Sequence, residues 1–128
     1  MKCLKNESKG NSAKMELFIC PHCFEVFTLK QQTTLIGLIK ACQEIVEMLE
    51  VTTDPEAFKP QKIGAGGDES VGLDLMAEAI FVQRLQRFGQ ISSEESGIIG
   101  EGEAQIVLDP IDGSDNLLTR FPYYGASI

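Results

Sequence analysis

The 128-residue sequence has little basic charge: 11 Lys and Arg residues stand against 19 Asp and Glu residues, for a formal net charge of −8. Without a basic stripe to neutralise phosphates, nucleic acid is not an expected partner. The chain also lacks any hydrophobic run of membrane-spanning length, and its first fourteen residues are polar rather than signal-like. These absences predict a soluble, cytoplasmic protein that does not associate with a membrane.

Cysteine is sparse as well. There are four, at Cys3, Cys20, Cys23 and Cys42, and without a secretory leader they are expected to be reduced thiols. Cys20-Pro21-His22-Cys23 resembles half of a zinc ribbon, but a tetrahedral site needs two more ligands. Cys42 is a poor candidate because it falls on the apolar side of a predicted helix, where a small core residue is expected. We favour an apolar segment here, with a zinc or redox role as the alternative.

The pattern of polar and apolar residues divides the chain near residue 32. Residues 1–32 are predicted to form a polar tail and an appended Cys-containing segment, with a short hairpin or an apolar flap at 15–29. Apolar residues then recur every three or four positions from Thr33 to Leu49 and from Gly72 to Phe88, which predicts two amphipathic helices. Gly89 is expected to end the second helix.

Short strands are predicted at 90–92, 106–109 and from 124 onward, with a short helix at 114–119. The alternation of helices and strands indicates the α/β class, as a layered α+β sandwich over residues 33–128.

Ile106 to Ser114 is the most informative run. Ile106-Val107-Leu108 has the character of a buried strand, and Asp109 stands at its carboxyl end, where open α/β sheets place ligands. Pro110 is predicted to end the strand because it has no N–H to donate. Asp112 follows, and Gly113-Ser114 is expected to open a helix with Ser114 as its N-cap. Two carboxylates beside a helix N-terminus suit a cation and a phosphate held together.

Asp109-Pro110-Ile111-Asp112-Gly113-Ser114, followed by Asn116 and Phe121-Pro122, resembles the signature of the inositol monophosphatase / fructose-1,6-bisphosphatase superfamily. These are metal-dependent, lithium-sensitive sugar phosphatases. Ser93-Glu94-Glu95-Ser96 resembles the paired-Glu segment of that superfamily. Residues 62–78 resemble the segment that carries its catalytic Asp, here Asp74. The resemblance covers about residues 33–128 and implies a sugar-phosphatase-like fold.

The resemblance implies that Glu94, Asp109, Asp112 and the backbone carbonyl of Ile111 bind Mg²⁺, as a site of two or three ions that Li⁺ inhibits. The residue types agree independently, since Mg²⁺ is a hard cation that prefers oxygen ligands. Asp109 would bridge two cations, which can hold both the attacking and the leaving oxygen of an in-line displacement.

The resemblance also assigns the phosphate contacts and the catalytic pair. Backbone N–H groups at Gly113 and Ser114 would point at the phosphate. The Ser114 hydroxyl, oriented by Asp74, would position the attacking water and help to deprotonate it. Simpler readings exist for each residue: Asp-Pro-x-Asp-Gly can be a plain turn, Glu94-Glu95 a solvated pair, and Asp74 a first-turn helix residue. Their joint occurrence in the family's order favours the functional reading.

We therefore expect a Mg²⁺-dependent phosphomonoesterase acting on a small phosphorylated sugar or polyol, such as fructose 1,6-bisphosphate or an inositol phosphate. Ser114 with Asp115 departs from the Thr-rich pattern of inositol phosphatases and favours the sugar bisphosphatases.

A second hypothesis is that the chain is a truncated N-terminal part of such an enzyme. The strand predicted at Tyr124–Ile128 has no predicted partner, and the family's metal site is completed by a later Asp. The chain would then be a catalytically incomplete fragment with a partial metal site, acting at most by association. A full-length form could assemble as a homodimer.

Overall fold

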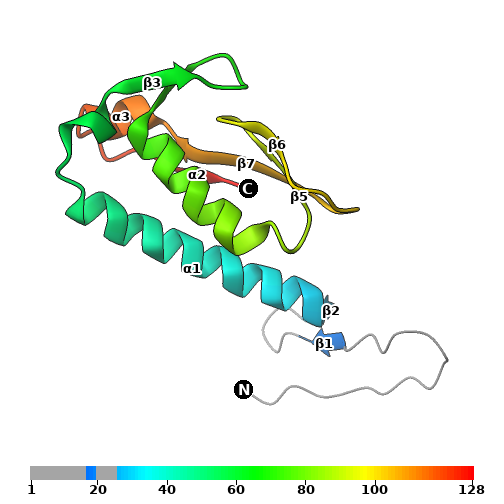
Figure 1. Ribbon diagram of the computed structural model, residues 1–128. Coiled ribbons are helices and arrows are strands. Elements are labelled where there is room, and N and C mark those ends of the chain that lie inside the picture. The colour runs from blue at the N-terminus through cyan, green and yellow to red at the C-terminus, as the bar shows by residue number, and fades with distance from the viewer. Residues whose placement is uncertain (1–16, 20–25) are drawn as a thin grey trace. The chain divides into compact units, whose positions relative to one another are not determined.

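The computed structural model describes residues 17–19 and 26–128 (Figure 1). The predicted polar tail and the Cys20-Pro21-His22-Cys23 motif lie outside the described residues. The chain divides into two compact units, and the division falls between Ile36 and Gly37, within the first helix.

The first unit contains a two-stranded antiparallel hairpin, one of the two forms expected for residues 15–29. Strand β1 (Leu17–Ile19) pairs with β2 (Val26–Thr28), so that Leu17 lies opposite Thr28. Helix α1 (Leu29–Val51) begins directly after β2, four residues before the predicted start at Thr33. The extension is understandable because Lys30, Gln31 and Gln32 are good helix formers that carry no apolar periodicity.

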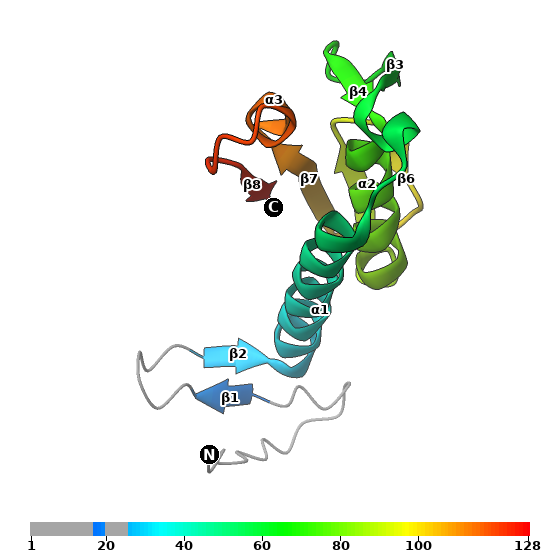
Figure 2. The ribbon, with the colours of Figure 1, turned by 90° about the vertical axis from the view of Figure 1, so that its left-hand side faces the viewer.

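The second unit holds the remaining elements, which Figure 1 shows from one side and Figure 2 after a quarter turn. Its helices are the later part of α1, the 3₁₀ turn η1 (Pro55–Phe58), α2 (Gly72–Leu85) and α3 (Ser114–Leu118). Its strands are β3 (Pro60–Ile63), β4 (Glu69–Val71), β5 (Gln90–Ser93), β6 (Gly97–Ile99), β7 (Gln105–Asp112) and β8 (Gly125–Ser127). No helix among the described residues is long and apolar enough to cross a bilayer.

The strands form a small hairpin, β3–β4, and a four-stranded sheet in the order β6-β5-β7-β8. Within that sheet β5 and β7 are parallel, with Ile91 opposite Ile106, and the two outer pairings are antiparallel. The strand at the end of the chain, for which no partner is evident in the sequence, therefore pairs with β7.

Helix α2 covers one face of this sheet. Its inward side chains recur every four residues, at Leu73, Ala77, Phe81 and Leu85, and all are at most 1% exposed. They share one core with the sheet residues Ile91, Leu108 and Ile111 and with Ala41 and Ile45 of α1. Burial of a side chain the size of Phe81 contributes roughly 2–3 kcal/mol. This packing fixes the start of α2 beside the end of β7, where the acidic residues lie.

Strand β7 is buried on one face only. Leu108 is 1% exposed, whereas its neighbour Val107 is 69% exposed, so the continuous apolar run does not mean burial on both sides. The strand also does not stop at Pro110 but continues to Asp112. Pro110 is tolerated because the pairing with β5 ends at Leu108 and the register with β8 is irregular between Asp109 and Asp112.

Two predictions about single residues of the helices are wrong. Cys42 is an exposed free thiol, because Gly37, Ala41 and Ile45 form the buried stripe of α1. Gly89 does not cap α2, which ends at Leu85 with Gln86 as C-cap. A glycine is needed at 89 for space instead: a Cβ there would lie 2.4 Å from the carbonyl oxygen of Ala104.

Candidate active site

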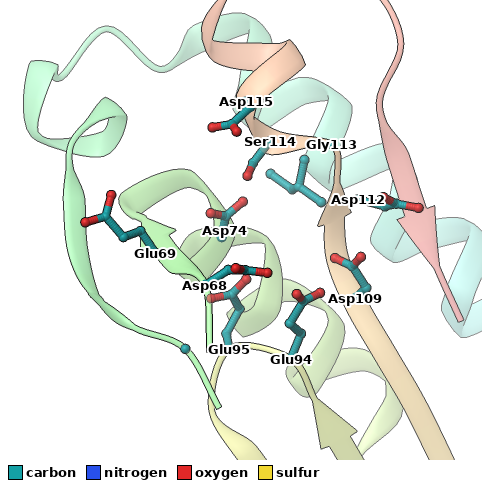
Figure 3. Close-up of a pocket in the computed structure, with 12 residues that line it drawn as sticks. Asp68, Glu69, Asp74, Glu94, Glu95, Asp109, Asp112, Gly113, Ser114 and Asp115 are labelled. Carbon is teal, nitrogen blue, oxygen red and sulfur yellow. The ribbon is translucent and has the colours of Figure 1, made fainter. Parts of the chain in front are cut away.

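A cavity of about 430 Å³ lies at the carboxyl end of β7, between that strand, the start of α2 and the loop of the β3–β4 hairpin (Figure 3). All seven residues singled out from the sequence line it. Their individual roles remain predictions. The complete lining is Gly64, Asp68, Glu69, Asp74, Glu94, Glu95, Asp109, Ile111, Asp112, Gly113, Ser114 and Asp115.

The four acidic residues predicted from the sequence reach this cavity from three directions. Asp74 comes from the first turn of α2, Glu94 from the turn after β5, and Asp109 and Asp112 from the end of β7. Because β5 and β7 are parallel, Glu94 and Asp109 follow paired residues, Ser93 and Leu108, at the same edge of the sheet. The backbone N–H of Glu94 also donates to the carbonyl of Leu108 at 2.9 Å. Carboxylates 15 positions apart in the sequence are thereby brought together.

Asp74 is a buried carboxylate that is only half satisfied. It is 2% exposed, and its Oδ2 accepts a hydrogen bond of 2.9 Å from the backbone N–H of Val71. Its Oδ1 is buried without a hydrogen-bond partner. Burial raises the pKa of Asp74 from 3.8 to about 6, although the Val71 hydrogen bond opposes the shift. The nearby charges of Glu95, Glu94 and Asp115 raise the pKa further.

Asp109 lies against Glu94. Burial, followed by the charge of Glu94 and a hydrogen bond with its carboxyl group, raises the pKa of Asp109 to about 7. Asp112 adds to the negative charge, and its own Oδ2 accepts a hydrogen bond of 3.2 Å from the Ser127 hydroxyl on β8. So high a pKa is expected for a carboxyl group that has no positively charged neighbour, because a nearby positive charge would lower the pKa.

The turn that carries Glu94 is held by the β3–β4 loop. The backbone N–H groups of Ala65 and Gly66 donate to the carbonyls of Glu95 and Glu94, at 3.1 and 2.8 Å. A Cβ at Gly66 would lie 2.8 Å from Cγ of Glu94, so glycine at this position leaves space for the Glu94 side chain. Ser70, also from this hairpin, donates to the Glu95 carboxylate. The β3–β4 loop thus forms one wall of the cavity.

Gly113 makes the turn into α3. Its φ of +84° is a conformation that other residues rarely adopt, and it occupies the N-cap position in place of Ser114, which was expected there. Ser114 is instead the first residue of α3, and it lines the cavity. The turn is fixed from the other side by Asn116, whose amide donates to the Tyr123 carbonyl at 2.7 Å.

The charge balance of the cavity calls for cations. Of its twelve lining residues eight are acidic and, within the described part of the chain, none is basic. The donors are hard oxygens, and the buried Oδ1 of Asp74 lacks a partner, which fits Mg²⁺. No three of the described acidic, His or Cys side chains are yet gathered closely enough to hold a metal ion. The donor chemistry is therefore present, while the ligands are spread around the cavity.

Four acidic residues at the cavity were missed by the sequence analysis as site residues. Glu95 and Asp115 stand next to motif residues, so adjacency alone could have indicated them. Asp68 and Glu69 belong to the β3–β4 hairpin, where β3 is exposed throughout and shows no apolar alternation. Only the fold brings these two residues to the site.

The comparisons with known proteins agree with this geometry. The chain is 35% identical over 77 residues to the fructose-1,6-bisphosphatase of Pyrococcus furiosus, covering 59% of this chain and 30% of that protein. It is 42% identical over 99 residues to the bifunctional NADP phosphatase/NAD kinase of Methanocaldococcus jannaschii, covering 70% and 17%. The crystal structure of Leishmania major fructose-1,6-bisphosphatase superposes with a TM-score of 0.59 at 20% identity, over 73% of this chain and 35% of that one. No protein-family model matches.

The mixed helix-and-sheet fold is thus the one shared by fructose-1,6-bisphosphatase and the extragenic suppressor protein SuhB. The resemblance to the inositol monophosphatase / fructose-1,6-bisphosphatase superfamily is confirmed by both sequence and structure. The chain spans less than a third of the length of the curated relatives it matches.

Proposed function

We propose that this chain carries the cation and phosphate site of a cytoplasmic, Mg²⁺-dependent phosphomonoesterase. The observation that supports the proposal most strongly is the shared cavity: eight carboxylates and the Gly113-Ser114 turn line it without a basic residue among the described ones. Such a cavity repels a phosphate unless cations mediate, and Mg²⁺ commonly binds through carboxylates together with phosphates.

Glu94, Asp109, Asp112 and the carbonyl of Ile111 would hold the cations. When bound, Mg²⁺ supplies positive charge that polarises the phosphate and lowers the pKa of water. Asp109 lies against Glu94 and feels the charge of Asp112, so the three carboxylates would share the task of holding the cations. Loss of its proton, held with a pKa of about 7, would accompany binding.

Ser114 and Asp74 would prepare the nucleophile. The Ser114 hydroxyl would accept a hydrogen bond from water and donate its own proton toward the free Oδ1 of Asp74. Val71 fixes the other oxygen of Asp74, so the carboxylate cannot turn freely. Gly113 and Ser114 would present backbone N–H groups to the phosphate.

For the substrate we propose a small phosphorylated sugar or polyol, with fructose 1,6-bisphosphate and inositol 1-phosphate as the first candidates. Two relatives named for fructose-1,6-bisphosphatase and inositol-1-monophosphatase activity support this class. The relative named as an NADP phosphatase makes a phosphorylated nucleotide the third compound to test.

The test is phosphate release from these three compounds by the purified chain, with Mg²⁺ or with EDTA. We expect release that needs Mg²⁺, is inhibited by Li⁺, and falls at least about 100-fold in Asp109→Asn. Glu101→Gln is the matched control, because it removes an exposed carboxylate outside the cavity. Release that persists in EDTA or in Asp109→Asn would contradict the proposal.

A second candidate function is cation binding without turnover. The spread of the ligands favours it over turnover, because no three described donors are gathered closely enough to hold a metal ion, and turnover by a two-cation clamp needs a more complete set of ligands than weak binding does. In that case calorimetry would detect Mg²⁺ binding that Asp109→Asn removes, while none of the three substrates would release phosphate.

A further inference from the structure

A second set of polar contacts, made by residues that do not line the cavity, joins three elements at Ser96. Its hydroxyl donates to Oε1 of Glu78, on α2, at 2.6 Å. The same hydroxyl accepts a hydrogen bond of 3.1 Å from Nζ of Lys62, on β3. Neither Glu78 nor Ser96 lines the cavity. Ser96 is therefore the link between a carboxylate and an ammonium group that do not touch each other.

Burial of the Glu78 carboxylate is energetically unfavourable, because the charged group loses its hydration. It is 7% exposed, and its Oε2 is buried without a hydrogen-bond partner. A buried carboxylate is tolerated when hydrogen bonds and a nearby positive charge offset its lost hydration. Here the Ser96 hydroxyl supplies a hydrogen bond to Glu78, and the exposed ammonium group of Lys62 binds the same hydroxyl. Glu78 lies four residues after Asp74, on the same side of α2, so both carboxylates are fixed by one helical turn.

Ser96 belongs to the turn that carries Glu94, and its contacts restrain that turn. The carbonyls of Glu94 and Glu95 are bound by the N–H groups of Gly66 and Ala65 from one side. The Ser96 hydroxyl bound to Glu78 ties the same turn to α2. The turn is thereby anchored to two elements, which restricts where the Glu94 carboxylate can point.

We propose that Glu78, acting through Ser96, is a positioning residue for the cation site. The inference rests on the proposed function, because it assumes that Glu94 is a ligand. Residues that orient metal ligands typically change metal affinity by 10- to 100-fold when they are altered.

The test is a titration with Mn²⁺, a divalent cation that prefers oxygen ligands. Electron paramagnetic resonance measures the concentration of unbound Mn²⁺, and the bound fraction follows by difference. Ser96→Ala removes the link with the smallest change of volume, and we expect Mn²⁺ affinity to fall about tenfold. Ser96→Thr keeps the hydroxyl and should restore most of the affinity. Ser96→Ala combined with Glu78→Gln should be no weaker than Ser96→Ala alone, since both changes break one contact.

Ser92→Ala is the control, because it removes a half-buried serine hydroxyl on β5 that takes no part in these contacts. A purely structural role for Glu78 would lower the melting temperature in EDTA and leave Mn²⁺ affinity unchanged, which would overturn the proposal. If Ser96→Ala fails to fold, Glu78→Gln, which keeps the side-chain volume, decides the same question. If the unaltered chain does not bind Mn²⁺, the proposed function is wrong. If all variants bind Mn²⁺ equally well, the proposed function stands and the positioning role of Glu78 is wrong.

Discussion

The backbone N–H of Val71 binds one oxygen of Asp74 at 2.9 Å and leaves the other oxygen buried without a partner. The first contact is ordinary capping, in which an acidic side chain satisfies an N–H group at the start of a helix. The second is a cost that capping does not require, since Asp74 is 2% exposed and its pKa is raised to about 6. A buried carboxylate oxygen that destabilises the fold and has no structural role indicates that Asp74 serves the function of the site.

Asp74→Asn should therefore separate stability from activity. We expect phosphate release to fall about 100-fold or more, because the amide cannot accept a proton. We also expect the melting temperature at pH 8 in EDTA to rise or stay the same, since the variant removes a buried charge that lacks compensation. A clearly lower melting temperature would mean that Asp74 serves the helix rather than the reaction.

Stability without cations should decrease as pH rises. The folded-state pKa values of Asp74 and Asp109, about 6 and about 7, lie above the unfolded value of 3.8, so the folded chain binds protons more tightly. The resulting stabilisation is fully present below about pH 4 and is lost as pH rises through 6 and 7. For Asp74 the loss is roughly 1–2 kcal/mol after solvent screening.

Urea unfolding in EDTA at pH 5 and pH 8 measures this dependence. The difference in unfolding free energy between the two pH values should be smaller in Asp74→Asn than in the unaltered chain. Equal differences in the two proteins would contradict the assigned origin of the pKa shift.

Two neighbouring glycines should respond oppositely to alanine. The three atoms nearest to a Cβ at Gly66 all belong to the Glu94 side chain, the closest at 2.8 Å, so Gly66→Ala should displace that carboxylate and weaken Mg²⁺ binding at little cost in stability. A Cβ at Gly67 meets nothing within 4 Å, but its φ of +102° is unfavourable for alanine. Gly67→Ala should cost about 1–3 kcal/mol and leave Mg²⁺ affinity nearly unchanged. Calorimetry and thermal melting on the pair check this, and identical behaviour would count against it.

Gly89→Ala should be strongly destabilising. Its Cβ would lie 2.4 Å from the carbonyl oxygen of Ala104, and backbone atoms cannot move aside as a flexible side chain can. We expect a loss of about 1–3 kcal/mol, or roughly 5 °C or more in melting temperature. Gly125→Ala is the matched control, since its Cβ would meet nothing within 4 Å. A similar small effect in both would show that the backbone at 89 relaxes.

The residues of the candidate site could be predicted from the sequence because their signals are local. Asp109, Asp112, Gly113 and Ser114 stand in one short run, and parallel pairing of β5 with β7 brings Glu94 to the same edge. Asp68 and Glu69 could not be predicted, because the exposed β3 strand has no apolar alternation to indicate a hairpin.

The errors in the fold prediction share a cause: each depends on a partner distant in the sequence. Pro110 fits inside β7 because the pairing with β5 ends at Leu108 and β8 pairs irregularly beside it. Cys42 is exposed because the buried stripe of α1 runs through Gly37, Ala41 and Ile45, and Gly37 lies against Arg84 and Leu85. Gly89 is required by the path of Ala104, fifteen residues later. Local propensity contains none of these contacts.

The most direct test of the central claim is calorimetric titration of Mg²⁺ into the chain at pH 7, in two buffers of different ionisation enthalpy. We predict binding whose apparent heat differs between the buffers, because Asp109, with a pKa of about 7, must release its proton to bind a cation. Asp109→Asn should abolish the binding, and Glu101→Gln should not. An absence of binding heat in both buffers, with the chain folded by circular dichroism, would contradict the assignment of this acidic cavity as a cation site.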